Sequence, residues 1–260
     1  MGVDFSCLDG MQREVAERLI ERESAQRHHL VVALSGSHAY GFPSPDSDLD
    51  LKAIHVADTD RLLGLGSSDP TANRLEIIDG VEIDYTSNEL GAVLKGILAG
   101  NGNYIERVLG PLLVYTTPEL AELAPLVRGA LSRKVHHHYH GFAHSQRKAV
   151  AEADAPTAKK LLYVFRTALT GVHLLMTGEL VTDVTVTARA HGVVGIDELL
   201  AIKQAGERTA LAPTDADAWK SRMTQAFELL DDARRRSVLP AEPANVAELD
   251  AWLVALRRRR

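Results

Sequence analysis

Residues 34–52 read Leu-Ser-Gly-Ser-His-Ala-Tyr-Gly-Phe-Pro-Ser-Pro-Asp-Ser-Asp-Leu-Asp-Leu-Lys, and this stretch decides the fold. A Gly-Ser pair, Gly36-Ser37, ends one apolar run, and two aspartates, Asp48 and Asp50, begin the next. Side chains alternate along a strand, so both carboxylates of an Asp-x-Asp segment lie on one side. Glycine lets the backbone approach a phosphate closely, and serine adds a hydroxyl donor. Because Mg²⁺ binds carboxylates together with nucleotide oxygens, the pattern predicts a metal–nucleotide site.

The spacing of these residues resembles the signature of a known enzyme superfamily. Gly36-Ser37, a gap of nine residues, and Ser47-Asp-Leu-Asp50 are similar to the motif of the DNA polymerase β superfamily of nucleotidyltransferases. That superfamily carries a third carboxylate on a later strand. The segment Gly80–Thr86 supplies Asp84, an acid between two apolar residues, with Glu82 as the reserve.

The resemblance assigns a role to each of these residues. It implies a two-metal site for Mg²⁺, in which Mn²⁺ can substitute, with Asp48, Asp50 and Asp84 as the ligands. Asp84 can also accept the proton of the attacking hydroxyl. Gly36 and Ser37 are expected to contact the β and γ phosphates of the nucleotide. The alternatives are an Asp-rich turn that caps backbone amides and, for the third acid, a solvent-facing side chain on an edge strand.

Further segments resemble one branch of the superfamily, the nucleotidyltransferases of bacteria and phages that include RNA-repair-ligase-associated proteins. These segments are Asn101–Leu109, the His/Tyr-rich run at 136–144 and Lys159–Arg166, in that order. One face of the predicted helix carries Lys159, Tyr163 and Arg166 at helical spacing. The resemblance implies that this face binds the nucleotide. A solvated basic stripe with the tyrosine packed inward is the equal alternative.

The histidine-rich run presents a second face, because His136, His140 and His144 are spaced one helical turn apart. Imidazoles at this spacing can chelate zinc, but no Cys or Glu completes a tetrahedral set. A polar surface or phosphate contacts are the favoured interpretation. The C-terminal run Arg257–Arg260 is either a phosphate contact or a solvated helix end.

The composition is that of an ordinary soluble protein, with 260 residues, 45% hydrophobic and 25% charged. The formal net charge of −6 argues against a basic coat over the whole surface, and the single cysteine excludes an internal disulfide framework. No apolar run is long enough to cross a membrane, and no signal-peptide core is present near the start. We therefore expect a cytoplasmic protein.

Apolar periodicity predicts an α+β fold: a small mixed-sheet nucleotidyltransferase domain over residues 1–115, followed by an all-helical nucleotide- or acceptor-binding domain over 116–260. In the first domain we expect strands over 30–34, 48–56 and 80–86, helices over 9–28, 89–99 and 103–109, and an irregular loop over 61–70. Ser87 or Asn88 is expected to cap the helix at 89. In the second domain we expect helices over 117–128, 131–152, 157–177, 195–206, 214–236 and 245–258.

These observations favour a Mg²⁺-dependent nucleotidyltransferase that moves a nucleoside monophosphate from an NTP to an acceptor hydroxyl and releases pyrophosphate. The resemblance, together with the basic residues that concentrate in the helical part, makes an RNA end the expected acceptor, with tRNA among the candidates. Two other classes remain open. One is a transferase that modifies a hydroxyl on a protein, and the other is a nucleotide- or RNA-binding module without catalysis.

Overall fold

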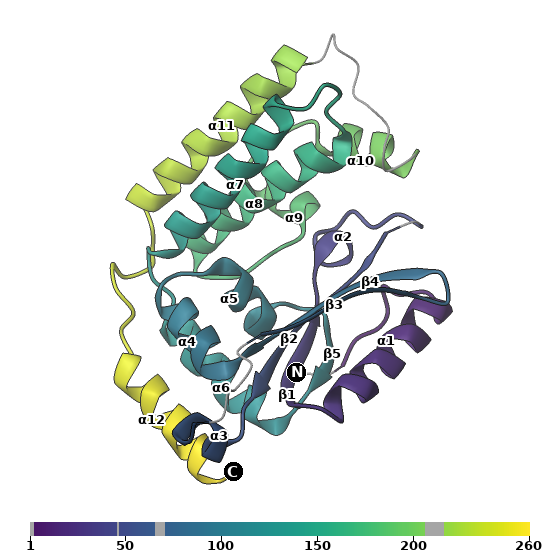
Figure 1. Cartoon of the computed structure of the whole chain (residues 1–260). Helices are drawn as coiled ribbons and strands as arrows, with labels where there is room; N and C mark the ends of the chain where they lie inside the picture. The colour runs from purple at the N-terminus through teal and green to yellow at the C-terminus, as the bar shows by residue number, and fades with distance from the viewer. Residues whose placement is uncertain (1–2, 46, 66–70, 206–215) are drawn as a thin grey trace. The chain divides into compact units, whose positions relative to one another are not determined.

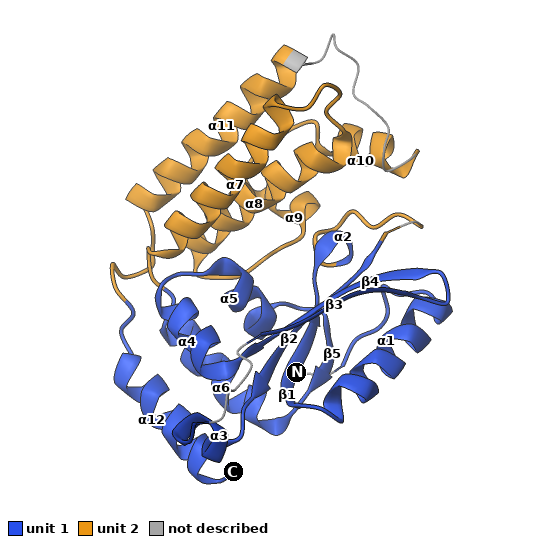
Figure 2. Ribbon diagram, in the orientation of Figure 1, with its two compact units in different colours: residues 1–38, 48–131, 243–260 blue, residues 39–47, 132–242 orange. Residues whose placement is uncertain are grey.

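The fold is α+β, as predicted, and combines one five-stranded mixed sheet with helices (Figure 1). The structure is a computed structural model that describes residues 3–45, 47–65, 71–205 and 216–260. The chain forms two units (Figure 2): unit 1 contains residues 1–38, 48–131 and 243–260, and unit 2 contains 39–47 and 132–242. In the described part of the chain, no helix is long and apolar enough to span a membrane.

The sheet lies in unit 1, with the strand order β3-β4-β2-β1-β5. The pair β2–β4 is parallel, whereas the pairs β1–β2, β1–β5 and β3–β4 are antiparallel. The strands are β1 (His28–Leu34), β2 (Leu49–Val56), β3 (Thr71–Ile78), β4 (Val81–Glu89) and β5 (Leu113–Thr116). The predicted strands correspond to β1, β2 and β4.

One face of the sheet packs against α1 (Gly10–Ser24). The helix starts with a capping box, in which Asp9 accepts from the Gln12 backbone and the Gln12 side chain accepts from the Asp9 backbone. Its apolar positions share one side and meet alternate residues of β2 and β4. The resulting core contains Val15, Ala16, Leu19, Ile20, Val32, Leu34, Leu49, Leu51, Ala53, Ile83, Tyr85 and Val114.

Strand β3 was not predicted. The preceding region was interpreted as an irregular loop, and no element was assigned to the residues that form β3. The structure places α3 (Thr59–Leu63) at the start of that loop, and residues 66–70 lie outside the described residues. The missed signal is Asp79-Gly80 between two alternating segments. Asp79 has φ 52° and Gly80 has φ 82°, and positive φ at both central residues characterises the tight turn that joins twisted antiparallel strands.

The helices α4 (Leu90–Leu98) and α5 (Gly102–Leu109) follow β4. Ser87 and Asn88, the predicted caps, belong to β4, and Glu89 caps α4 instead by accepting from the Gly91 backbone at 2.6 Å. Arg107 is buried and joins α5 to the sheet, because it donates to the Ala53 carbonyl at 3.1 Å. Helix α5 confirms the short helix that was predicted at 103–109.

Two helices beyond the predicted domain boundary at 115/116 belong to unit 1, namely α6 (Pro118–Gly129) and α12 (Val246–Arg258). Three arginines at the C-terminal end pair with carboxylates of this unit. The pairs are Arg257 with Glu89 at 2.8 Å, Arg259 with Glu122 at 3.5 Å and Arg260 with Glu119 at 3.0 Å. These arginines therefore attach α12 to the rest of unit 1.

Unit 2 is helical, and α8 is its central helix. The helices are α7 (Val135–Ala151), α8 (Ala158–Thr177), α9 (Val184–Ala190), α10 (Ile196–Gln204) and α11 (Ala216–Arg235). Helix α9 was not predicted, since its Val-Thr-Val-Thr sequence has low intrinsic helix propensity. It forms because Asp183 caps it, accepting from the Thr185 backbone at 2.7 Å.

The segment 39–47 joins unit 2 although it lies between the Gly-Ser pair and the Asp-x-Asp motif in sequence. The Thr182 hydroxyl donates to the Ala39 carbonyl at 2.7 Å, and the Val184 backbone donates to the Tyr40 carbonyl at 3.0 Å. Lys203, almost fully buried, donates to the Ser44 hydroxyl at 2.7 Å. Backbone and side-chain bonds together hold this segment against α8–α10.

Candidate functional site

The two acids predicted to matter most meet across the central parallel pair of strands. Asp50 of β2 is the register partner of Asp84 of β4. The flanking residues of both strands, such as Leu51 and Ile83, are buried against α1, so alternation places the two carboxylates together on the other face. There the Asp50 side chain is 23% exposed and the Asp84 side chain 48%, which leaves both reachable by a ligand.

Lys52 belongs to the same cluster, although we did not single it out in the sequence. Its Nζ lies 2.8 Å from Asp84 Oδ1 and 3.7 Å from Asp50 Oδ1, and it also donates to the Asp84 carbonyl at 3.3 Å. The signal was present, because Lys52 follows Asp50 by two residues and shares its face. Its positive charge offsets the repulsion between the two carboxylates.

The Gly-Ser turn lies directly against Asp50. Gly36 has φ +63°, and a Cβ at this position would overlap Asp50 Oδ2 and lie 2.8 Å from Asp50 Cγ. The Ser35 backbone donates to the Asp50 carbonyl at 2.9 Å, which joins the end of β1 to the start of β2. Ser37 is buried in the helical turn α2 (Gly36–Ala39). Glycine is required here for both its backbone conformation and its lack of a side chain.

Asp48 lies immediately before β2 and is half-buried, on the same side as Asp50 by alternation. Among the residues that the structure describes, no three His, Cys, Asp or Glu side chains lie close enough together to hold a metal ion. The donor chemistry nevertheless fits Mg²⁺, since Asp48, Asp50 and Asp84 offer only hard carboxylate oxygens beside a glycine cradle. In this arrangement the Lys52 ammonium supplies the positive charge between Asp50 and Asp84.

The predicted nucleotide-binding face of α8 packs partly inward within unit 2. The Tyr163 ring lies edge-on to Tyr40 at 6.0 Å and to Phe42 at 5.4 Å between centroids. Arg166 is 2% exposed, and its guanidinium carbon lies 3.3 Å from the centroid of Tyr40. Lys159 is half-buried. The structure thus brings Tyr163 and Arg166 against the segment that directly follows Gly36-Ser37 in the chain.

The histidine face of α7 makes protein contacts. His136 Nε2 lies 3.0 Å from Asp231 Oδ1 of α11, and the rings of His140 and His144 stack with centroids 6.4 Å apart. Burial, with a smaller contribution from Arg234, lowers the pKa of His136, although the hydrogen bond to Asp231 opposes this shift. These contacts give the face a packing role between α7 and α11.

A match to a protein-family model agrees with the motif. The model of a family described as "RNA repair pathway DNA polymerase beta family" matches residues 11–255. The uncharacterized protein MJ0002 of Methanocaldococcus jannaschii is 27% identical over 227 residues, which cover 85% of this chain and 91% of that protein. A solved nucleotidyltransferase-like protein from Exiguobacterium sibiricum aligns with a TM-score of 0.34 and 12% identity, covering 96% of this chain and 81% of that chain.

Proposed function

Because the chain belongs to the RNA repair pathway DNA polymerase beta family, we propose that it is a Mg²⁺-dependent nucleotidyltransferase that transfers a nucleoside monophosphate from an NTP to an acceptor hydroxyl. The observation that carries this proposal is the contact of the Gly36 backbone with Asp50, which is itself in register with Asp84. One phosphate-binding turn and two carboxylates therefore share one face of a rigid sheet, the arrangement that a positioned phosphoryl transfer needs.

Asp48, Asp50 and Asp84 are the residues that would hold Mg²⁺. The bound metal would supply charge neutralisation on the phosphates and a lower pKa for the attacking hydroxyl. The half-exposed position of Asp84 supports a second task for this residue, accepting the proton of the acceptor hydroxyl.

The protein's own groups would bind and orient the triphosphate. The backbone at Gly36 and the hydroxyl of Ser37 would bind the β and γ phosphates and orient the triphosphate. The acceptor oxygen would then form a bond to the α-phosphorus while the bond from that phosphorus to the bridging oxygen breaks, and pyrophosphate leaves. The proton of the acceptor passes to Asp84, so charges and atoms balance.

In unit 2, we assign nucleotide contacts to Lys159 and Tyr163, whose positions on α8 are partly exposed. Arg166 is buried against Tyr40, and this supports an indirect role in which it holds the segment 39–47 in shape. The same segment continues directly from the Gly-Ser turn, so its order bears on the triphosphate contacts.

An RNA end is the acceptor that we propose. The family description points to RNA repair, and the surface beside Asp84 suits a nucleobase. Leu75 of β3 is the register partner of Asp84, and Ile77 is the partner of Glu82. Leu75 and Ile77 are 79% and 72% exposed, so an apolar strip lies on the sheet face next to the acids. A base packed on this strip would place its sugar hydroxyls near Asp84.

The test is transfer of label from each α-³²P-NTP, with Mg²⁺, to total RNA, purified tRNA and cellular protein. The double variant Asp50→Asn/Asp84→Asn is expected to abolish labelling. Glu14→Gln, which changes an exposed acid of α1 in the same unit, is the matched control and should retain it. RNA labelling that disappears only in the double variant supports the proposal. Labelling confined to protein refutes the RNA acceptor, and absence of labelling with every acceptor refutes the transferase.

A further inference from the structure

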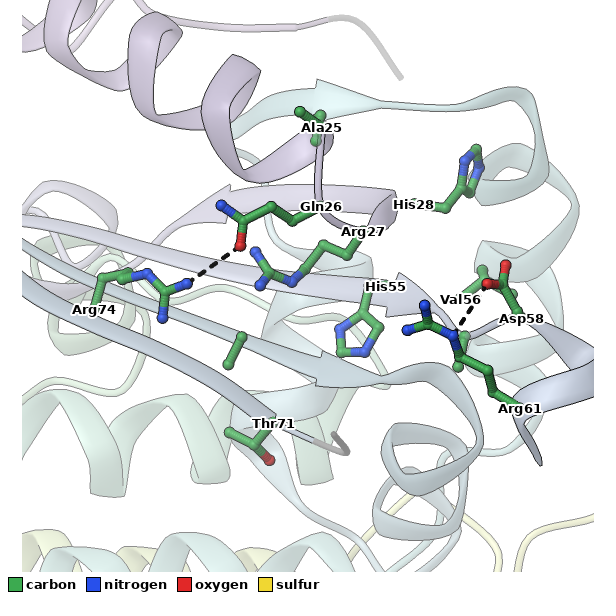
Figure 3. Close-up of a pocket in the computed structure, with 13 residues that line it drawn as sticks. Ala25, Gln26, Arg27, His28, His55, Val56, Asp58, Arg61, Thr71 and Arg74 are labelled. Carbon is green, nitrogen blue, oxygen red and sulfur yellow. Dashed lines mark hydrogen bonds and ion pairs between the residues drawn. The ribbon is translucent and has the colours of Figure 1, made fainter. Parts of the chain in front are cut away.

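A pocket lies in unit 1 beside the end of α1 (Figure 3). It has a volume of about 530 Å³ and is built where α1 ends, β1 begins, β2 ends and β3 begins. Arg74 of the pocket is the register partner of Tyr85, the neighbour of Asp84, and its side chain pairs with Glu23 of α1. Alternation therefore places the pocket on the face of the sheet that α1 covers, whereas Asp50 and Asp84 lie on the other face. The pocket is therefore a separate place on the molecule.

The lining of this pocket is positively charged. The lining includes three arginines, Arg27, Arg61 and Arg74, one acid, Asp58, which lies beside Arg61, and two histidines, His28 and His55 (Figure 3). The formal charge of these lining residues is +2 with both histidines neutral, and the buried Glu23, which pairs with Arg27 and Arg74, reduces it to +1. Guanidinium groups bind phosphate oxygens through two parallel hydrogen bonds, which makes a phosphate group the ligand that best fits this chemistry. We call this site the arginine pocket.

Two of the arginines are held in place before any ligand binds. Glu23 is fully buried and pairs with Arg27, and it also accepts from Arg74 Nε at 3.2 Å. Arg74 is fixed further, since its Nη1 donates to the Asn73 carbonyl at 2.8 Å and its Nη2 donates to Gln26 at 3.4 Å. Groups that are already ordered lose little entropy on binding, so their position favours affinity.

The third arginine is adjustable. Arg61 lies on the short helix α3, its side chain is 69% exposed, and its Nε is 3.6 Å from Asp58 Oδ2. An exposed pair of this length is weak, so Arg61 can turn toward a ligand at little cost. A fixed pair of guanidinium groups with one adjustable partner suits a phosphate that enters from solvent.

Two neighbouring histidines have lowered pKa values, chiefly because they are buried. Burial is the largest cause that lowers the pKa of His28, and the charge of Arg260 lowers it further. Beneath the pocket, burial, then Arg27 and then His55 lower the pKa of His29 to about 4. The charge of Arg27 therefore reaches His29, and an anion in the pocket would be attracted by the same charge.

We infer that the arginine pocket is a second binding site, for a phosphate group carried either by a free nucleotide or by an RNA strand. The inference does not depend on nucleotidyl transfer at the carboxylates. A volume of about 530 Å³ lies within the usual range of about 300–1,000 Å³ for small-ligand sites, so it accommodates a whole nucleotide.

The experiment measures binding without Mg²⁺, so that transfer plays no part. ATP and inorganic phosphate form one arm, and a fluorescent single-stranded RNA forms the other, each titrated against the full chain. Arg61→Glu is the main variant, because its partner is exposed and the fold does not depend on it. Arg13→Glu, an exposed arginine on α1 paired with Glu17, is the matched control for net charge.

We expect Arg61→Glu to weaken binding about tenfold, as is typical for the loss of a hydrogen bond between charged groups, while Arg13→Glu leaves it within a factor of two. The side-chain NMR signals of His28 and His55 should shift on addition of the ligand that binds. Loss confined to RNA identifies a strand as the source of the phosphate, and loss with ATP or phosphate identifies a free compound.

Equal binding by the wild type, Arg61→Glu and Arg13→Glu, with unmoved histidine signals, overturns the inference. This result can be told apart from failure of the proposed function. The transfer assay reports on Asp50 and Asp84, whereas the binding assay reports on a pocket on the opposite face of the sheet.

Discussion

The position of Lys52 makes a prediction about metal binding that can be measured without knowing the substrate. Its ammonium is 2.8 Å from Asp84 and 3.7 Å from Asp50, two of the residues that we expect to hold Mg²⁺. A cation can approach both carboxylates closely only when this ammonium moves away. The variant Lys52→Met removes the charge and keeps a side chain of similar length.

The size of the effect follows from the exposure of the partners. At 2.8 Å and an effective dielectric constant of about 20, two unit charges attract by about 6 kcal/mol, which is an upper limit. Asp84 is 48% exposed, and water screens a pair of this kind to about 1 kcal/mol. Repulsion between the facing carboxylates adds a similar amount once the lysine is gone. The variant without metal should therefore be less stable by about 1–2 kcal/mol.

Loss of the ion pairs of Lys52 should also raise the affinity for Mg²⁺. Because Mg²⁺ no longer competes with the ammonium, Lys52→Met should bind it about tenfold more tightly, which corresponds to about 1.4 kcal/mol. In thermal unfolding, the melting temperature without metal should fall by about 2–4 °C for each kcal/mol lost. Saturating Mg²⁺ should restore most of that loss and raise the variant more than the wild type.

The assay is thermal unfolding over a Mg²⁺ titration, with isothermal calorimetry for the binding constant. Lys95→Met, which removes an exposed lysine of α4 in the same unit, is the matched control and should behave as the wild type. Unchanged or weaker Mg²⁺ binding by Lys52→Met would refute the reasoning. So would a metal response of equal size in Asp50→Asn/Asp84→Asn, because the metal would then bind elsewhere.

Three further predictions concern the turn, the pH profile and a helix cap. Gly36→Ala should abolish transfer and lower stability by about 1–3 kcal/mol in urea unfolding, since its Cβ would overlap Asp50. Gly80→Ala, which shares positive φ but meets nothing within 4 Å, should keep activity. The folded pKa of His29, about 4, lies below its usual value, so the unfolded chain binds the proton more readily. Stability is therefore complete above pH 6.5 and falls by about 3 kcal/mol toward pH 4, and His29→Gln should flatten that profile in urea unfolding. Asp183→Ala should cost about 1 kcal/mol in the same measurement, because α9 loses its cap, and an unchanged midpoint would contradict this role.

Local patterns were enough to place the strands that carry the acids. The runs that became β2 and β4 have apolar alternation, whereas β1 is a continuous apolar run that ends at a recognisable turn before Gly36. The edge strands β3 and β5 were missed. The residues of β3 are half-buried or exposed, and Leu75 and Ile77 are open to solvent. No buried run therefore marks this strand in the sequence.

Helix α9 was missed by the sequence-based prediction for a different reason. Its β-branched residues favour a strand by propensity, but the Asp183 cap and the backbone bond from Val184 to Tyr40 select a helix. A contact with a segment far away in sequence thus outweighed the intrinsic preference.

The sequence alone determined which acidic residues can bind a metal ion and which of them share one side of a strand. Alternation places Asp48 with Asp50, and it places Asp84 opposite Ile83 and Tyr85, because successive side chains of a strand point to opposite faces. Tertiary structure decided which of these groups meet. The parallel register of β2 and β4 aligns Asp50 with Asp84 and brings Lys52 to both. Register, strand order and the arginine pocket arise from contacts between distant segments, and local periodicity carries no information about those contacts.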